Sequence, residues 1–210
     1  MIPTVTNPMG ISLYGRRLQY LASTGTQYID TGIAPDFANG DKVEIRFYMP
    51  EPSAAQFAIF GSRTAATTNG LYVLADKRNA YAPLQFVACD SAGYLVYNAA
   101  GINPKYWDEE VKMTVENGSL TVASTHYNGT YTFSEQITTE CPVYLFSLNS
   151  ANSSISIYSG MRLYEWKYWR NGTLAQHLIP VLDRSGVPCL YDTISRTLKY
   201  NAGTGTFDYA

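Results

Sequence analysis

The sequence predicts an all-β domain, a two-sheet antiparallel jelly-roll sandwich, and three observations support this fold class. Residues Lys42 to Met49 alternate between polar and apolar side chains, as a strand with one buried face does. Asn-Gly pairs at 117–118, 128–129 and 171–172 lie between β-forming segments. Each pair is expected to form a two-residue hairpin turn, because Asn and Gly both tolerate a positive φ. Short apolar runs between turn residues recur roughly every 8–12 residues, which is the spacing of strands in a sandwich or barrel.

The expected strands follow one another along most of the chain. In the strand from Lys42 to Met49, the side chains of Val43, Ile45, Phe47 and Met49 are expected to face the core. Further strands are expected at Gln56–Phe60, Leu71–Ala75, Leu84–Cys89, Tyr94–Tyr97, Val111–Val115, Leu120–Val122, Val143–Leu148, Ile155–Tyr158 and Met161–Trp169. No segment carries apolar residues at the spacing of an amphipathic helix, so helices are not expected.

The first sixteen residues differ from the rest of the chain. Pro3, Pro8, Gly10 and Gly15 interrupt them, and no alternation develops. The sequence therefore predicts a short extended N-terminal arm, residues 1–16, ahead of a single domain, residues 17–210. Such an arm either docks onto another protein or is a loose terminus that leads into the first strand.

The overall composition excludes two classes of partner. The chain has 210 residues and a net charge of −2, and single all-β domains commonly reach this length. Charged residues make up 15% of the sequence, against about 25% in a typical globular protein. No basic run is longer than two residues, the length of Arg16-Arg17, whereas nucleic acid binding needs a concentrated basic surface. No stretch approaches the roughly 18 consecutive apolar residues of a membrane-spanning helix, and Met1 to Pro8 do not resemble a secretory signal.

Most catalytic and metal sites require residues that are missing here. His126 and His177 are the two histidines, too few for a histidine-rich metal site. No phosphate-binding loop or nucleophile elbow is present. Glycoside hydrolysis needs two carboxyl groups about 5–9 Å apart, and the Glu-x-Asp-x-x-Glu strand that supplies them in sandwich glucanases does not occur. The sequence therefore predicts a protein that binds rather than catalyses, with no cofactor and no metal ion.

The three cysteines, Cys89, Cys141 and Cys189, are widely spaced and odd in number. They are expected to be small buried hydrophobic residues, although one disulfide with a single thiol left over is the alternative.

Three segments resemble one known type of domain. They are Leu18–Gly32, Val143–Asn149 and the stretch from Tyr164 to Phe207, which contains Leu178-Ile179-Pro180-Val181, Leu190-Tyr191-Asp192 and Tyr200-Asn201-Ala202-Gly203. Together they resemble the concanavalin A-like (LamG-like) jelly-roll domains of phages, prophages and gut bacteria, over about residues 17–210. The resemblance implies turns at Gly25 and Gly32. It also implies that Asp30 and Asp192 accept backbone hydrogen bonds at strand ends, with a metal-binding role for Asp30 as the alternative.

The resemblance also implies a function, because domains of this kind serve as adhesion or carbohydrate-binding modules and as capsid-decoration, head-fibre or tail-fibre parts of phages. We therefore expect a non-enzymatic phage virion protein that exposes a jelly-roll head for host-surface or glycan adhesion. Such a protein would assemble into the virion in the host cytoplasm, so it would need no signal peptide. Expected partners are other virion proteins through the N-terminal arm, surface glycans, and further copies of the chain in a homo-oligomer. The alternatives are a bacterial carbohydrate-binding module and, more remotely, a glycoside hydrolase.

A sugar site takes stacking surface from aromatic rings and hydrogen bonds from polar groups. The candidate ligand-binding residues are Trp107, Tyr164, Trp166, Tyr168 and Trp169. Regular alternation places Tyr164, Trp166 and Tyr168 on one face of their strand, opposite Met161 and Leu163. If the two aliphatic side chains mark the core, the three aromatics form an outer patch. If the aromatics are core, that patch does not exist.

Overall fold

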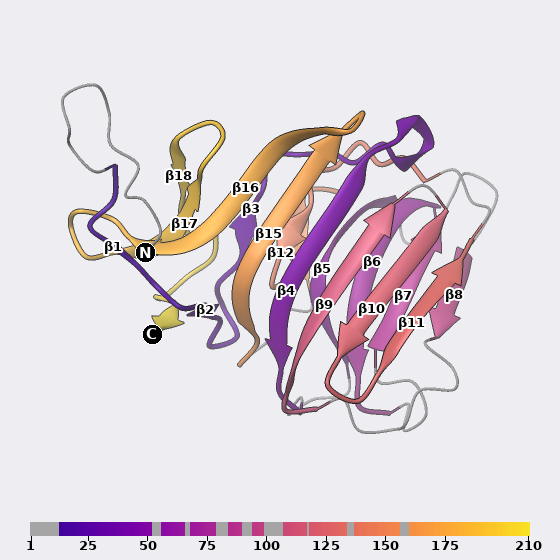
Figure 1. Ribbon diagram of the computed structural model, residues 1–210, viewed down its shortest axis with the longest axis horizontal. Coiled ribbons are helices and arrows are strands. Elements are labelled where there is room, and N and C mark those ends of the chain that lie inside the picture. Colours follow the sequence, from indigo (N-terminus) through magenta and orange to yellow (C-terminus); the bar gives the residue numbers. More distant parts are fainter. Residues whose placement is uncertain are drawn as a thin grey trace.

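The computed structural model describes residues 13–51, 56–65, 68–78, 84–89, 94–98, 107–116, 118–133, 137–155 and 160–210. Within these ranges the chain forms two β-sheets that pack as a jelly-roll sandwich (Figure 1), which confirms the predicted fold class. The one helix in the same ranges is the short 3-10 helix η1 (Phe37–Asn39). No helix in the described part of the chain is long and apolar enough to cross a membrane.

The larger sheet has eleven strands among the described residues. Its main path runs through β11 (Asn128–Thr132), β10 (Ser119–Ser124), β9 (Glu109–Glu116), β4 (Lys42–Met49), β15 (Arg162–Arg170), β16 (Thr173–Leu182), β17 (Pro188–Asp192) and β18 (Thr197–Lys199). Three short strands pair beside this path: β1 (Arg16–Arg17) with β16, β2 (Leu21–Ala22) with β15, and β19 (Asp208–Tyr209) with β2.

The smaller sheet has eight strands among the described residues. Its path runs through β14 (Ser153–Ile155), β13 (Leu148–Ser150), β5 (Gln56–Ala65), β6 (Thr68–Asp76), β7 (Leu84–Cys89) and β8 (Tyr94–Asn98), and β12 (Tyr144–Leu145) joins β5 to β3 (Ile29–Asp30). Figure 1 shows β9, β10 and β11 of the larger sheet lying over β5 to β8 of the smaller one.

The core lies between the two sheets, and β4 shows how the sequence builds it. Val43, Ile45, Phe47 and Met49 are all buried, whereas the side chains between them are partly exposed, as the alternation predicts. Across the core, the ring of Phe60 in β5 meets the ring of Trp166 in β15 edge-on, with 5.4 Å between their centroids. This contact joins the two sheets at their centre.

Two of the three predicted Asn-Gly turns are confirmed. Glu116 of β9 pairs with Ser119 of β10, so the connection has two residues, of which Gly118 has a φ of 74° and Asn117 lies outside the described residues. Between β15 and β16, Asn171 and Gly172 have φ values of 49° and 75°. Positive φ at both positions is the requirement of a type I′ turn.

The prediction of a turn at Asn128-Gly129 is wrong. Both residues lie inside β11, where Gly129 pairs with Val122 of β10, and the connection between the two strands falls at residues 125–127. Gly129 does not have the positive φ that a type I′ turn requires.

The described end of the expected N-terminal arm packs against the larger sheet. The Gly15 N–H donates to the carbonyl of Leu182 at 2.9 Å, and Arg16 pairs with the same residue of β16. The ring of Tyr14 is buried against Tyr191, with 5.0 Å between centroids. Residues 1–12 of the arm lie outside the described residues.

Two expectations about single residues are confirmed. Asp30 Oδ1 accepts the Gly32 N–H at 2.8 Å, and Asp192 Oδ1 accepts the N–H groups of His177 and Ile194 at 3.1 and 3.0 Å, so both carboxylates bind backbone near strand ends.

The cysteines that the structure describes are buried. Cys141 and Cys189 are free thiols, and burial raises the pKa of Cys189 to about 12. The side chain of Cys89 lies outside the described part.

Candidate functional site

The five aromatic residues predicted to bind a ligand do not share one surface, because β15 contains a β-bulge. Leu163 pairs with Phe47 of β4, and Glu165 pairs with Arg46, so Tyr164 is left without a partner. One extra residue turns all later side chains of a strand to the opposite face. The expected regular alternation of β15 is therefore wrong.

Trp166 and Tyr168 consequently face the core together with Leu163. Trp166 is 0% exposed and Tyr168 is 1% exposed. The indole N–H of Trp166 donates to Gln176 Oε1 at 3.1 Å, which satisfies its one polar group inside the core. A ligand at the surface cannot stack on either ring, so the predicted aromatic patch loses these two members.

The other three candidates are half-buried and lie far from one another. Trp107 lies at one end of β4, because the N–H of the next residue, Asp108, donates to the carbonyl of Met49. Trp169 lies at the other end of β4, where it pairs with Lys42. At about 3.4 Å per residue, the two ends of this eight-residue strand, beside which Trp107 and Trp169 lie, are roughly 24 Å apart. Tyr164 lies between these ends on the outer face of the sheet.

The Tyr164 ring has the Arg46 guanidinium 4.7 Å from its centroid. Partial burial, followed by the nearby Glu110 carboxylate, raises the Tyr164 pKa.

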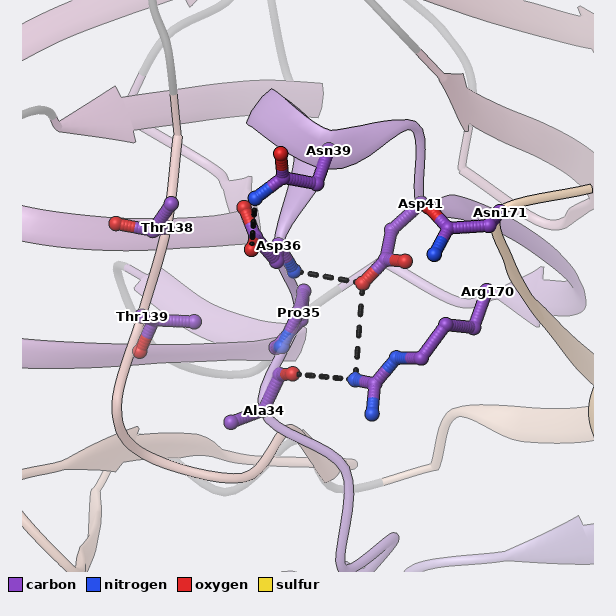
Figure 2. Close-up of a pocket in the computed structure, with 9 residues that line it drawn as sticks. All are labelled: Ala34, Pro35, Asp36, Asn39, Asp41, Thr138, Thr139, Arg170 and Asn171. Atoms are coloured by element: carbon purple, nitrogen blue, oxygen red, sulfur yellow. Dashed lines mark hydrogen bonds and ion pairs between the residues drawn. The ribbon is translucent and has the colours of Figure 1, made fainter.

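Trp169 lines a hollow where β4 begins and the β15–β16 turn closes. One pocket, of about 600 Å³, is lined by Ala34, Pro35, Asp36, Asn39, Asp41, Thr138, Thr139, Arg170 and Asn171 (Figure 2). A second, of about 450 Å³, is lined by Gly40, Asp41, Lys42, Glu116, Trp169 and Gly172. Because Asp41 lines both pockets, they are neighbours, and we call them together the strand-end hollow.

Four segments that are distant in sequence form the strand-end hollow, and one of them is β9, which contributes Glu116. Residues 34–41 contain η1, which ends at Gly40 in the left-handed conformation, with a φ of 86°. Asp36 in this segment pairs with Thr138 through an isolated β-bridge. The type I′ turn at Asn171 brings the end of β15 against the same segment.

The buried carboxylate of Asp41 holds the wall between the two pockets. Asp41 is 2% exposed, and its Oδ2 accepts hydrogen bonds from the Asp36 N–H, at 2.7 Å, and from the Tyr168 hydroxyl. Arg170 Nη2 lies 3.7 Å from the same oxygen. Burial, followed by the hydrogen bond to Asp41, raises the pKa of Tyr168 well above its usual range, so its hydroxyl stays a donor.

Arg170 lies at the rim of the larger pocket. Figure 2 shows its guanidinium directed at Asp41 and at the carbonyl of Ala34, to which Nη2 donates at 3.1 Å. The same nitrogen donates to the hydroxyl of Tyr168 at 2.9 Å. The side chain is nevertheless 54% exposed, so guanidinium N–H groups other than those of Nη2 remain accessible at the rim.

The carboxylate of Asp36 has one oxygen without a partner. Its Oδ2 accepts a hydrogen bond from the Asn39 amide nitrogen at 2.5 Å, but Oδ1 is buried and has no hydrogen-bond partner in the described part of the protein. Leaving a buried acceptor unsatisfied costs about 1–3 kcal/mol, and more for a charged group.

The smaller pocket combines an aromatic ring with an ion pair. Lys42 Nζ lies 5.3 Å from the centroid of the Trp169 ring and 3.0 Å from Glu116 Oε2. An aromatic wall beside polar groups is the usual lining of a site for a small polar ligand. The sequence marked Trp169 for this site, but it gave no sign that Asp36, Asn39 and Asp41 would lie beside it.

Away from the hollow, Glu165 on the outer face of β15 makes the domain sensitive to acid. His177 Nε2 lies 2.7 Å from Glu165 Oε1, and Lys167 Nζ lies 3.0 Å from Oε2. The hydrogen bond to His177, followed by that to Lys167, lowers the Glu165 pKa from 4.5 to about 2. A carboxyl group whose pKa is lower in the folded state stabilises the protein above its unfolded pKa. This stabilisation is lost as the pH falls from about 4.5 towards 2.

We therefore expect about 1–2 kcal/mol of the free energy of unfolding to be lost through Glu165 between pH 7 and pH 3. Urea unfolding of wild type and Glu165→Gln at the two pH values measures this, and the variant should lose less stability on acidification. Glu140→Gln removes an exposed carboxylate as the control. Equal losses in wild type and Glu165→Gln would contradict the expectation.

The comparisons with known proteins show likeness in fold. No protein-family model matches the chain, and no curated protein matches its sequence. A Bacteroides ovatus protein provisionally described as carbohydrate-binding superposes with a TM-score of 0.58 at 9% identity, over 92% of this chain and 60% of its own. The enzymatically active domain of tailspike protein 2 from bacteriophage CBA120 superposes with a TM-score of 0.50 at 9% identity, over 73% of this chain and 25% of that one. This chain thus spans less than two thirds of either protein, and its fold is similar to that of the matched part of each.

Proposed function

We propose that this chain is a non-catalytic carbohydrate-binding domain and that the strand-end hollow holds the sugar. The observation that carries this proposal is the position of Trp169, a half-buried ring in the wall of a hollow lined mainly by polar side chains. A sugar ring has an apolar face of C–H groups that stacks on an indole, and a rim of hydroxyls that needs donors and acceptors. Asn39, Arg170 and Asn171 supply such groups around the hollow.

The state of the carboxylates supports binding rather than hydrolysis. A glycosidase needs one carboxylic acid to donate a proton and one carboxylate to act as base or nucleophile. Asp41 is buried and already accepts hydrogen bonds from Asp36 and Tyr168, and Glu116 forms an ion pair with Lys42. Both carboxylates are engaged in holding the walls of the hollow. Among the carboxylates that line it, this leaves Asp36 with an unpaired oxygen in the described part of the protein, whereas a glycosidase needs two. The B. ovatus protein, described as carbohydrate-binding, is compatible with this assignment.

Replacing Trp169 with alanine tests the proposal. On a glycan array followed by calorimetry, we expect the wild-type chain to bind a glycan and Trp169→Ala to bind it at least tenfold more weakly, since aromatic contacts of this kind are worth more than about 1.4 kcal/mol. Trp107→Ala is the matched control, because it removes a half-buried indole at the opposite end of β4 and should leave binding unchanged. Equal loss in both variants, or no bound glycan, would refute the proposal.

We further propose that the domain acts on a phage virion, where the residues before it contact other virion proteins and copies of the chain assemble into an oligomer. The resemblance of Leu18–Gly32 and Val143–Asn149 to jelly-roll domains of phages supports this setting. Immunogold labelling of purified particles tests it. Glycan binding without any label on particles would favour the bacterial carbohydrate-binding module instead.

A further inference from the structure

We propose that the strand-end hollow selects a neutral sugar and that two adjacent hydroxyls of this sugar bind the side chains of Asp36 and Asn39. The inference rests on the proposed function and adds the class of sugar and the groups that recognise it. It follows from one unsatisfied atom, from one amide group and from the balance of charge around the hollow.

The unsatisfied atom is Oδ1 of Asp36, a residue that lines the larger pocket. It is buried and has no hydrogen-bond partner among the described residues, whereas Oδ2 of the same carboxylate is bound by Asn39. A carboxylate oxygen is an acceptor only, so the group that satisfies it must be a donor. A sugar hydroxyl is such a donor, and its hydrogen bond to a charged acceptor is among the stronger ones.

Asn39 supplies the complementary group next to this acceptor. Its amide nitrogen carries two hydrogens, and one of them is used in the 2.5 Å bond to Asp36 Oδ2. The second hydrogen is left to donate to a ligand oxygen. An acceptor and a donor side by side match two adjacent hydroxyls, one of which donates while the other accepts.

The backbone fixes the turn that carries both side chains. Asp36 precedes η1 and Asn39 is its last residue, and the Asn39 N–H donates to the Asp36 carbonyl at 3.1 Å. Phe37 anchors this turn, because its side chain is 3% exposed and its N–H donates to Ile137 at 3.0 Å. With this turn held in place, rotation of the Asp36 carboxylate alone brings Oδ1 to the ligand, so little conformational entropy is lost when the ligand binds.

The charge around the hollow disfavours acidic sugars. Three carboxylates line it, on Asp36, Asp41 and Glu116, against two cations, on Lys42 and Arg170. Lys42 lies 3.0 Å from Glu116, and Arg170 lies 3.7 Å from Asp41, so each cation already faces a carboxylate. A sugar carboxylate or sulfate would therefore meet net negative charge, and like-charge contacts are costly.

The experiment compares neutral with acidic glycans on one array, using the full chain. We expect binding to neutral glycans, and calorimetry with the best-bound monosaccharide should show that its deoxy analogue lacking one of the two hydroxyls binds about tenfold more weakly or worse. Asp36→Asn should show a similar loss. Asp208→Asn removes an exposed carboxylate elsewhere and should bind like wild type.

The outcomes separate this inference from the proposed function. Binding to acidic glycans alone, lost in Trp169→Ala, would overturn the inference and keep the proposed function. Full affinity of Asp36→Asn for a neutral sugar, or full affinity of every deoxy analogue for the wild type, would also overturn it. If Asp36→Asn does not fold, the deoxy series on the wild-type chain decides the question.

Discussion

Replacing Trp166 with alanine is expected to lower the free energy of unfolding by about 3–5 kcal/mol, the range measured when a buried aromatic residue is truncated. Its indole is fully buried, packs edge-on against Phe60 of the opposite sheet and donates to Gln176. Truncation therefore leaves a cavity between the sheets and an amide oxygen without its donor. Because a domain is stable by only about 5–15 kcal/mol in total, the effect would be large.

Tyr164→Ala is the control for this prediction, since the two positions lie in one strand but on opposite faces. Its ring is half-buried on the outer face, so urea unfolding should show a loss of about 1 kcal/mol or less. If Tyr164→Ala proved as destabilising as Trp166→Ala, the bulge in β15 would be misplaced and the aromatic face predicted from the sequence would stand.

Replacing Asp41 with alanine is expected to lower the free energy of unfolding by about 3 kcal/mol and to abolish glycan binding. The substitution leaves the Asp36 N–H and the Tyr168 hydroxyl without their acceptor, at about 1–3 kcal/mol for each buried donor. It also removes the anion that faces Arg170. The wall shared by the two pockets would lose its support. Asp36 would also lose the hydrogen bond that holds its backbone, and with it the position of its side chain.

Two further variants show which property of Asp41 matters. All three of its contacts meet at Oδ2, so the amide oxygen of Asp41→Asn can take this place and should restore most of the stability. A double-mutant cycle that combines Asp41→Ala with Tyr168→Phe should give a coupling energy of about 1 kcal/mol or more between the two side chains. Additive effects in urea unfolding would show that the Asp41–Tyr168 hydrogen bond does not stabilise the wall.

The parts of the fold that the sequence predicted are those set by local pattern. The alternation of β4 has period two over its whole length, and each of its buried side chains is where the pattern places it. The turn at Asn171-Gly172 needs positive φ at both positions, which few other residue pairs supply. At Asn128-Gly129 the same signal misled, because both residues lie inside β11 and the connection to β10 falls at residues 125–127.

The candidate site depended on features that no local pattern reveals. The sequence left open whether Tyr164, Trp166 and Tyr168 form an outer patch or belong to the core. The bulge at Tyr164 arises from how β15 pairs with β4, and it places Trp166 and Tyr168 in the core but not Tyr164. The strand-end hollow joins Asp36, Asp41 and Arg170 across more than a hundred residues of sequence. Sequence reasoning could mark Trp169 as a candidate, but it could not show which polar groups lie beside it.

The central claim is that the strand-end hollow binds the sugar. The NMR signals of the indole N–H groups of the three tryptophans give the most direct test of it. In a nitrogen-15 labelled sample, Trp169→Phe assigns one signal and Trp107→Phe another. Titration with the best-bound glycan is expected to shift the signal of Trp169 and to leave that of Trp107 in place. A shift of the Trp107 signal while the Trp169 signal stays unchanged would contradict the account.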